Sequence, residues 1–132
     1  MESKKTMKTK EKDRDTMSFG MIANAGDGRS SAFLALQSAE QGDFEKAESL
    51  LEQAKKAAAR AHQQQTQLLF DEVNGTPSAI NLLLVHAQDH LMTSMLAIEL
   101  IENMIHNLQR QREENASLQA QLDDLKKQLE TR

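Results

Sequence analysis

The chain of 132 residues contains no cysteine, tryptophan or tyrosine, and aromatic residues make up only 3% of it. Without cysteine there is no disulfide, no thiolate metal site and no cysteine nucleophile, as is typical of a cytosolic protein. So few aromatic residues would make a β-sandwich or barrel hard to pack. There is one proline and there are five glycines, so few residues interrupt helices, and the chain is rich in Ala, Leu, Gln, Glu and Lys. Composition therefore predicts an all-α fold.

A strong charge and long apolar runs are also missing. The formal net charge is −4 and the sequence pI is about 5.6, which argues against a nucleic-acid-binding protein, since those usually carry a basic excess. No run of 18 apolar residues is present, so no transmembrane helix is expected. The basic N-terminus is followed by no apolar segment and does not resemble a secretory signal. We expect a cytoplasmic protein with one modest core.

The N-terminal segment, residues 1–16, is rich in charge of both signs and has almost nothing apolar. Such a segment buries too little surface to offset its ordering entropy, so it is predicted to be a disordered tail, with a basic contact arm as the alternative. A first helix is predicted from about Met17 to Gln41. Gly26 and Gly28 interrupt it, which predicts either a kink or a close contact with another helix.

Two short segments predict the turns between helices. In QGDF, Gly42 suits the position just after a helix, and Asp43 suits the N-cap of a second helix from about Phe44 to Val73. That helix has an alanine-rich apolar stripe, and its His62 is expected to be a structural histidine. In NGTPS, Thr76 and Pro77 predict the start of a third helix, which runs to about Thr131.

The third helix has two parts with different patterns. From Leu82 to Ile105 it is apolar almost all round, so it must be covered on more than one side, and a homo-oligomer would cover it best. Further along, a heptad seam predicts a coiled-coil extension over residues 111–132, with a polar step at Gln111 and Asn115. The alternative, a lone solvated helix, would be marginal in water. Positions a and d of this seam are Ile101, Met104, Leu108, Gln111, Asn115, Leu118, Leu122, Leu125 and Leu129.

A cluster of ionisable residues, His86, Asp89 and His90, lies in the apolar part of the third helix. Their spacing of i, i+3 and i+4 places them on one helix face. A hydrogen-bonded polar patch is one interpretation, although a buried Asp89 would need a partner. A metal site is another, but HAQDH has Ala87 where the HExxH zinc motif has its glutamate. Phosphoryl transfer through a neutral imidazole is the third, and spacing alone does not choose among them.

The segment LLLVHAQDHLMTSMLA, Leu82–Ala97, resembles the signature helix of the lactose/cellobiose-specific enzyme IIA family of the bacterial phosphoenolpyruvate:sugar phosphotransferase system. The segments AGDGRS, QGDF, Ala61–His62 and Gln65–Thr66 are similar to other family segments and occur in the same order. The resemblance covers about residues 17–110.

The resemblance implies an antiparallel three-helix bundle at 17–110 that assembles as a homotrimer. The tail at 1–16 and the coiled-coil extension at 111–132 extend beyond this family core. It implies that His86 accepts a phosphoryl group from HPr and passes it to a cysteine of enzyme IIB, which serves the membrane permease IIC. Asp89 would lie at the trimer axis and share a divalent cation. Oxygen ligands favour Mg²⁺ for that cation. Gln88 and His90 match motif positions and would have supporting roles.

Two other functions compete with a phosphocarrier. One is a non-catalytic trimeric scaffold of the same fold that uses the coiled-coil tail to bind a partner, and the presence of His86 argues against it. The other is a metal-dependent hydrolase, which Ala87 disfavours. The sequence does not identify the sugar, because lactose, cellobiose and N,N′-diacetylchitobiose systems share this type of IIA.

Overall fold

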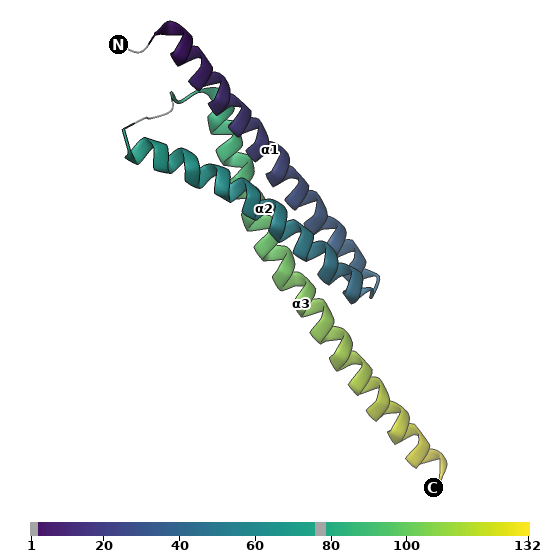
Figure 1. Cartoon of the computed structure of the whole chain (residues 1–132). Helices are drawn as coiled ribbons and strands as arrows, with labels where there is room; N and C mark the ends of the chain where they lie inside the picture. Colours follow the sequence, from purple (N-terminus) through teal and green to yellow (C-terminus); the bar gives the residue numbers. More distant parts are fainter. Residues whose placement is uncertain (1–2, 76–78) are drawn as a thin grey trace.

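The computed structural model describes residues 3–75 and 79–132, and the regular structure within these ranges consists of three α-helices (Figure 1). They are α1 (Lys4–Glu40), α2 (Phe44–Val73) and α3 (Leu82–Glu130). Helix α2 runs antiparallel to α1 and α3, and α3 extends far past the turn that joins α1 to α2 (Figure 1). The prediction of an all-α, antiparallel three-helix bundle is therefore confirmed. In the described ranges no helix combines the length and hydropathy that crossing a membrane requires.

The turn between α1 and α2 follows the prediction from QGDF. Gly42 has a φ of +86°, a left-handed conformation that glycine adopts without a steric penalty. Its N–H donates to the Ala39 carbonyl at 2.9 Å, and the Asp43 N–H donates to the Ser38 carbonyl at 2.9 Å, which is the Schellman arrangement. The Asp43 side chain then accepts from the Lys46 N–H at 3.1 Å and starts α2.

The first helix begins earlier than predicted, so residues 4–16 are helical and do not form a disordered tail. Ser3 caps the helix by accepting from the Thr6 N–H at 3.3 Å. Nearer the bundle, Asp15 is half-buried and accepts from the Asn81 side-chain amide at 3.3 Å. The start of α3 therefore supplies a partner for this segment, and the sequence of the segment alone does not reveal that contact.

The third helix begins later than predicted. Residues 79–81 are not helical, and the Asn81 side chain caps α3 by accepting from the Leu84 N–H at 2.8 Å. Asparagine is as good an N-cap as threonine, and its position directly before the apolar run decides the boundary. Thr76 and Pro77, which suggested an earlier start, lie outside the described residues.

Alanine fills much of the interior, as the stripe on α2 predicted, and lets the helices approach closely. One cluster of buried residues lies near the α1–α2 turn and includes Leu51, Ile98 and Ile105. Another lies nearer the start of α3 and includes Met21, Ala87 and Leu91. Helix α1 is continuous through its glycines. A Cβ on Gly28 would lie 3.0 Å from the Ala54 carbonyl oxygen, so the close-contact alternative is correct.

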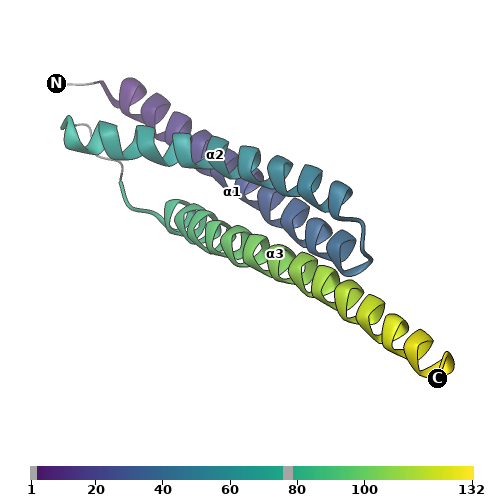
Figure 2. The ribbon, with the colours of Figure 1, turned by 90° about the horizontal axis from the view of Figure 1, so that it is seen from below.

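The two parts of α3 differ in how they are covered. Up to Ile105, α1 and α2 bury one side of the helix, while several large apolar side chains on the other side remain exposed. After Leu108 every residue is exposed. The last part of α3 extends past the α1–α2 turn and has no helix beside it in either view (Figures 1 and 2). Ile101 is buried in its own bundle, so the seam of the tail does not extend back to Ile101 as predicted. The outward apolar residues of the first part are Leu82, Val85, Met92, Leu96, Leu100 and Met104.

Candidate functional site on helix α3

His86 lies in the second turn of α3 and is exposed. Its orientation follows from Ala87 and Leu91, which are both 0% exposed and packed in the same cluster. Because these residues fix which side of α3 faces the bundle, the neighbouring positions of His86 and Asp89 are turned outward. The predicted cluster is therefore a surface feature of the single chain, and the interpretation of it as a polar patch in the core is wrong.

The imidazole of His86 contacts that of His90, one helical turn further along. The ring centroids are 4.5 Å apart and the ring planes lie at 79°, an edge-to-face arrangement. His90 is half-buried, so the bundle restrains its ring more than that of His86. His86 stays exposed beside this contact, and His90 is a neighbour that can donate or accept a hydrogen bond.

Gln88 is half-buried and connects the site to α2, because its side-chain oxygen accepts a hydrogen bond from the side-chain amide of Gln65. This bond joins α2 to α3 within one turn of His86. We predicted Gln88 as a supporting residue but did not assign a role to Gln65. The only signal for Gln65 in the sequence was its place in the QT pair that resembles a family segment.

Asp89 is exposed and shares the outward side of α3 with Val85 and Met92, four residues before it and three after. Its carbonyl oxygen accepts from the Thr93 hydroxyl at 2.7 Å. Among the described residues, its carboxylate has no hydrogen-bond or ion-pair partner. A carboxylate within an outward apolar surface therefore has its ligand capacity available to groups outside the chain.

One chain alone does not assemble a metal site. The described parts of the chain contain no group of three or more His, Cys, Asp or Glu placed to hold an ion. Asp89 supplies one carboxylate, and a divalent cation of the Mg²⁺ type takes several oxygen ligands. The residues present thus fit a metal only if further copies of the chain bring their own Asp89 to the same point. Ala87, at the glutamate position of a zinc motif, points into the core.

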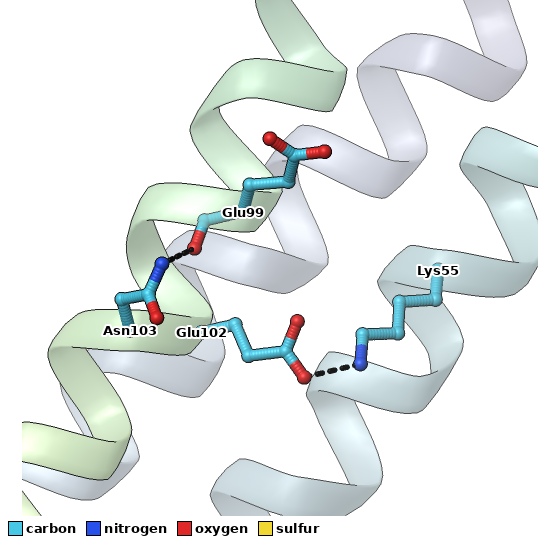
Figure 3. A network of polar contacts seen from close by, with 4 residues as sticks. All are labelled: Lys55, Glu99, Glu102 and Asn103. Carbon is cyan, nitrogen blue, oxygen red and sulfur yellow. Dashed lines mark hydrogen bonds and ion pairs between the residues drawn. The ribbon is translucent and has the colours of Figure 1, made fainter.

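His62 was predicted to be structural, but it is exposed and lines a groove of about 350 Å³ between α2 and α3. Ala58, Met95 and Ile98 provide apolar lining for this groove. Lys55 of α2 and Glu102 of α3 form an ion pair across it, and the Asn103 side chain donates to the Glu99 carbonyl at 3.1 Å (Figure 3). The ion pair across the groove joins α2 to α3. The residues that line the groove do not include His86, Asp89 or His90.

Comparisons with known proteins agree with this fold and show the family. Residues 16–109 match the model of the family described as "PTS system, Lactose/Cellobiose specific IIA subunit". The lactose-specific EIIA component of Lacticaseibacillus casei is 44% identical over 107 residues, which are 81% of this chain and 95% of that protein. The N,N′-diacetylchitobiose-specific EIIA component of Escherichia coli K12 is 43% identical over 97 residues, 74% of this chain and 84% of that protein.

Solved structures share the same architecture. The crystal structure of the cellobiose-specific enzyme IIA from Bacillus anthracis superposes with a TM-score of 0.72 at 34% identity, covering 85% of this chain and 94% of that one. The IIA(Chitobiose) chain in its solution complex with HPr, from Escherichia coli, gives a TM-score of 0.66 at 40% identity over 75% of this chain and 96% of that one.

The fold and the exposed histidine motif define a helical IIA component of a sugar phosphotransferase system. More narrowly, the chain belongs to the lactose/cellobiose-specific IIA family, because the family model covers most of its length and the relatives exceed 40% identity. Its class is therefore that of a phosphocarrier in sugar uptake.

Proposed function

We propose that this protein is a cytoplasmic phosphocarrier that accepts a phosphoryl group on His86 and passes it to a cognate enzyme IIB. The observation that carries the proposal is the exposed His86 ring at the family's motif position. A neutral imidazole is a competent nucleophile near neutral pH, because its ordinary pKa of about 6.5 leaves a ring nitrogen lone pair available.

The phosphoryl group is transferred in two steps, first to His86 and then to enzyme IIB. A ring nitrogen of His86 forms a bond to the phosphorus of phospho-HPr as the bond from phosphorus to HPr breaks. The phosphoryl group then leaves this nitrogen as a cysteine thiolate of enzyme IIB forms a bond to phosphorus. Such transfers need positioning and charge stabilisation more than covalent machinery from the carrier. The exposed ring suits the two protein partners, which have to reach it in turn.

His90 and Gln88 support the reacting ring in this proposal. His90 contacts the His86 ring at a centroid distance of 4.5 Å, so it limits the ring's orientation and can offer an N–H to the phosphoryl oxygens. Gln88 holds this part of α3 against α2 through Gln65. His90→Gln is therefore expected to slow phosphorylation of His86 without abolishing it.

We also propose that the chain functions as a homotrimer around the outward side of α3. Val85, Met92 and Leu96 leave about half of their surface exposed in one chain, and burying such side chains favours association. Asp89 lies among them, so a symmetric assembly would bring its carboxylates together. A shared Mg²⁺ would relieve their repulsion, with Asp89 as its ligand from each chain.

The relatives' names indicate the kind of sugar. They include lactose-, cellobiose- and N,N′-diacetylchitobiose-specific components, so we propose a disaccharide of this group as the transported substrate. The phosphoryl group would reach it through enzyme IIB and the permease IIC.

The test incubates the protein with phosphoenolpyruvate, enzyme I and HPr and measures its intact mass. We expect a gain of one phosphoryl group in the natural chain and in a His106→Ala control, whose exposed histidine lies further along α3. His86→Ala should gain none while remaining folded by circular dichroism. A natural chain that stays unmodified beside active HPr would favour the non-catalytic scaffold instead.

A further inference from the structure

The last part of α3, residues 113–130, projects beyond the bundle without support from its own chain. Among the described residues, Arg112 is the last one in α3 that bonds to another helix, donating to the Glu40 carbonyl at 2.7 Å. The remaining helix is about 27 Å long at ~1.5 Å per residue. A helix of this length is marginal in water unless something packs against it, yet it continues α3 without a break to Glu130.

One side of this tail carries a regular apolar seam. Leu118, Leu122, Leu125 and Leu129 follow one another at steps of four, three and four residues, and between 46% and 69% of each is exposed. Alternating steps of this kind place the side chains along one line, where they can insert as knobs into the holes of a partner helix. Charged residues at 113, 123, 124, 127 and 130 occupy the other side.

The seam is continuous with the outward side of α3 in the bundle. There the exposed apolar residues follow steps of four, from Met92 through Leu96 and Leu100 to Met104. The steps then change to the seven-residue repeat of the tail through Gln111 and Asn115. The apolar surface that we propose as the trimer contact in the bundle therefore continues into the seam of the tail.

Self-association meets no charge conflict in a parallel arrangement. Residues that flank the seam face each other across neighbouring chains, five positions apart, in a parallel coiled coil. This pairs Glu114 with Gln119 and Gln121 with Lys126, so no like charges meet. In the proposed trimer the three-fold axis runs along α3, so the three tails leave the bundles at the same end and only parallel packing is within their reach.

We infer that residues 113–130 form a parallel, in-register, three-stranded coiled coil between copies of this chain. It extends the proposed trimer and is independent of phosphoryl transfer. The tail lies beyond the residues that match the family, 16–109, so this contact is an addition to the family core. It leaves the bundle at the end opposite the start of α3, and so holds the copies together while the His86 end stays open to partners (Figure 1).

Single cysteines test the register, since the natural chain has none. Leu118→Cys and Leu125→Cys are oxidised in separate samples, with Ala120→Cys on the outer side as the control, and covalent dimers are measured on a denaturing gel. In-register packing brings identical residues together, so both seam variants should cross-link and the control should not. Three strands allow about two of every three chains to pair, because the third thiol lacks a partner.

Every other outcome overturns part of the inference. Complete conversion to dimers would indicate two strands, and cross-linking at only one seam position would indicate an antiparallel or shifted pair. Absence of cross-links at the seam, or equal cross-linking of the control, would show that the tail does not pair through this surface. Residue 125 is roughly 60 Å from His86 along the helix at ~1.5 Å per residue, and the assay needs no other phosphotransferase protein, so failure of phosphoryl transfer on His86 would leave its result unchanged.

A second pair of variants measures what the seam contributes. Leu122→Glu with Leu125→Glu places two charges in the seam, and Ala116→Glu with Ala120→Glu places the same charges on the outer side. By sedimentation equilibrium, we expect the seam variant to weaken self-association by about tenfold or more, and the outer variant to match the natural chain. Equal association of the two variants would contradict a role for the tail in assembly.

Discussion

The two parts of helix α3 both carry leucines at helical spacing but differ in their surroundings. Up to Leu108, α1 and α2 bury one side of the helix, whereas beyond Arg112 none of the other described residues bonds to it and all of its residues are exposed. Leucines recur at helical spacing in both parts, so spacing alone does not distinguish cover by the same chain from cover by another. In our account the first part, which ends at Arg112, holds the bundle together and presents His86, and the second part, residues 113–130, binds other copies. The residues buried in the first part are Ala87, Leu91, Ser94, Ile98, Ile101 and Ile105.

The sharpest way to separate the two parts is to truncate one leucine in each. Leu91 is fully buried by its own chain, so Leu91→Ala should lower the free energy of unfolding by about 2–5 kcal/mol at any protein concentration. Leu122→Ala should leave the bundle intact and lower stability only through association. Urea unfolding followed by circular dichroism at two protein concentrations would distinguish them. A concentration-independent loss of the same size for Leu122→Ala would break the comparison.

Packing within the bundle is tested by the two glycines of α1. Gly26 has open space where a Cβ would stand, so Gly26→Ala should raise the free energy of unfolding by about 0.5–1 kcal/mol through helix propensity. At Gly28 the Cβ would press on the Ala54 carbonyl at 3.0 Å, so Gly28→Ala should lower it by about 1 kcal/mol. Thermal unfolding of both variants measures the difference. An equal gain at both positions would mean that α1 and α2 can separate at little cost.

Arg112 marks the boundary between the two parts. It donates to the Glu40 carbonyl at 2.7 Å, and its guanidinium lies 5.8 Å from the centre of the Phe44 ring. Arg112→Ala should therefore lower the free energy of unfolding by about 0.5–1.5 kcal/mol. Within the described parts of the chain, Arg110 bonds only to Asn107 on the same helix, so Arg110→Ala should have a smaller effect. If chemical denaturation gave equal losses for the two, the boundary would not lie at Arg112.

The smallest effect is expected from the ion pair between Lys55 and Glu102. Both side chains are partly exposed, at 49% and 31%, so solvent screens their attraction. Glu102→Gln should lower the free energy of unfolding by about 0.2–1 kcal/mol, and the loss should shrink in high salt. Glu99→Gln serves as the control, because the ion pairs of the described residues do not include Glu99, and Figure 3 shows its carboxylate without an ion pair to Lys55. A loss that persists in molar salt would show that packing, not charge, is responsible.

Local signals in the sequence were sufficient to predict features that depend only on residues close together in the sequence. Gly42 and Asp43 specify the first turn, and the alanine stripe of α2 specifies a closely packed helix, because both depend on neighbouring residues. The predictions that α1 starts at Met17 and that His62 is a structural histidine were wrong. Both features depend on contacts between segments far apart in the sequence. Asn81 was overlooked as a cap because Thr76 and Pro77 offered a competing start signal.

The sequence predicted only the part of the candidate site that depends on one helix. The i, i+3, i+4 spacing places His86, Asp89 and His90 on one face, and helix geometry alone is enough for that. Spacing does not say whether the face is buried, and it does not reveal the bond from Gln65, which arises from packing of α2 on α3. Ile101 shows the limit for assembly: it fits the heptad seam but packs into its own bundle.

The central claim is that His86 alone among the four histidines carries the phosphoryl group. The most direct test phosphorylates the protein with phosphoenolpyruvate, enzyme I and HPr, digests it at alkaline pH, and locates the modified residue by tandem mass spectrometry. Our account predicts phosphorylation at His86 and full loss of that signal after the product is incubated with enzyme IIB. Phosphorylation at His62, His90 or His106 would contradict it.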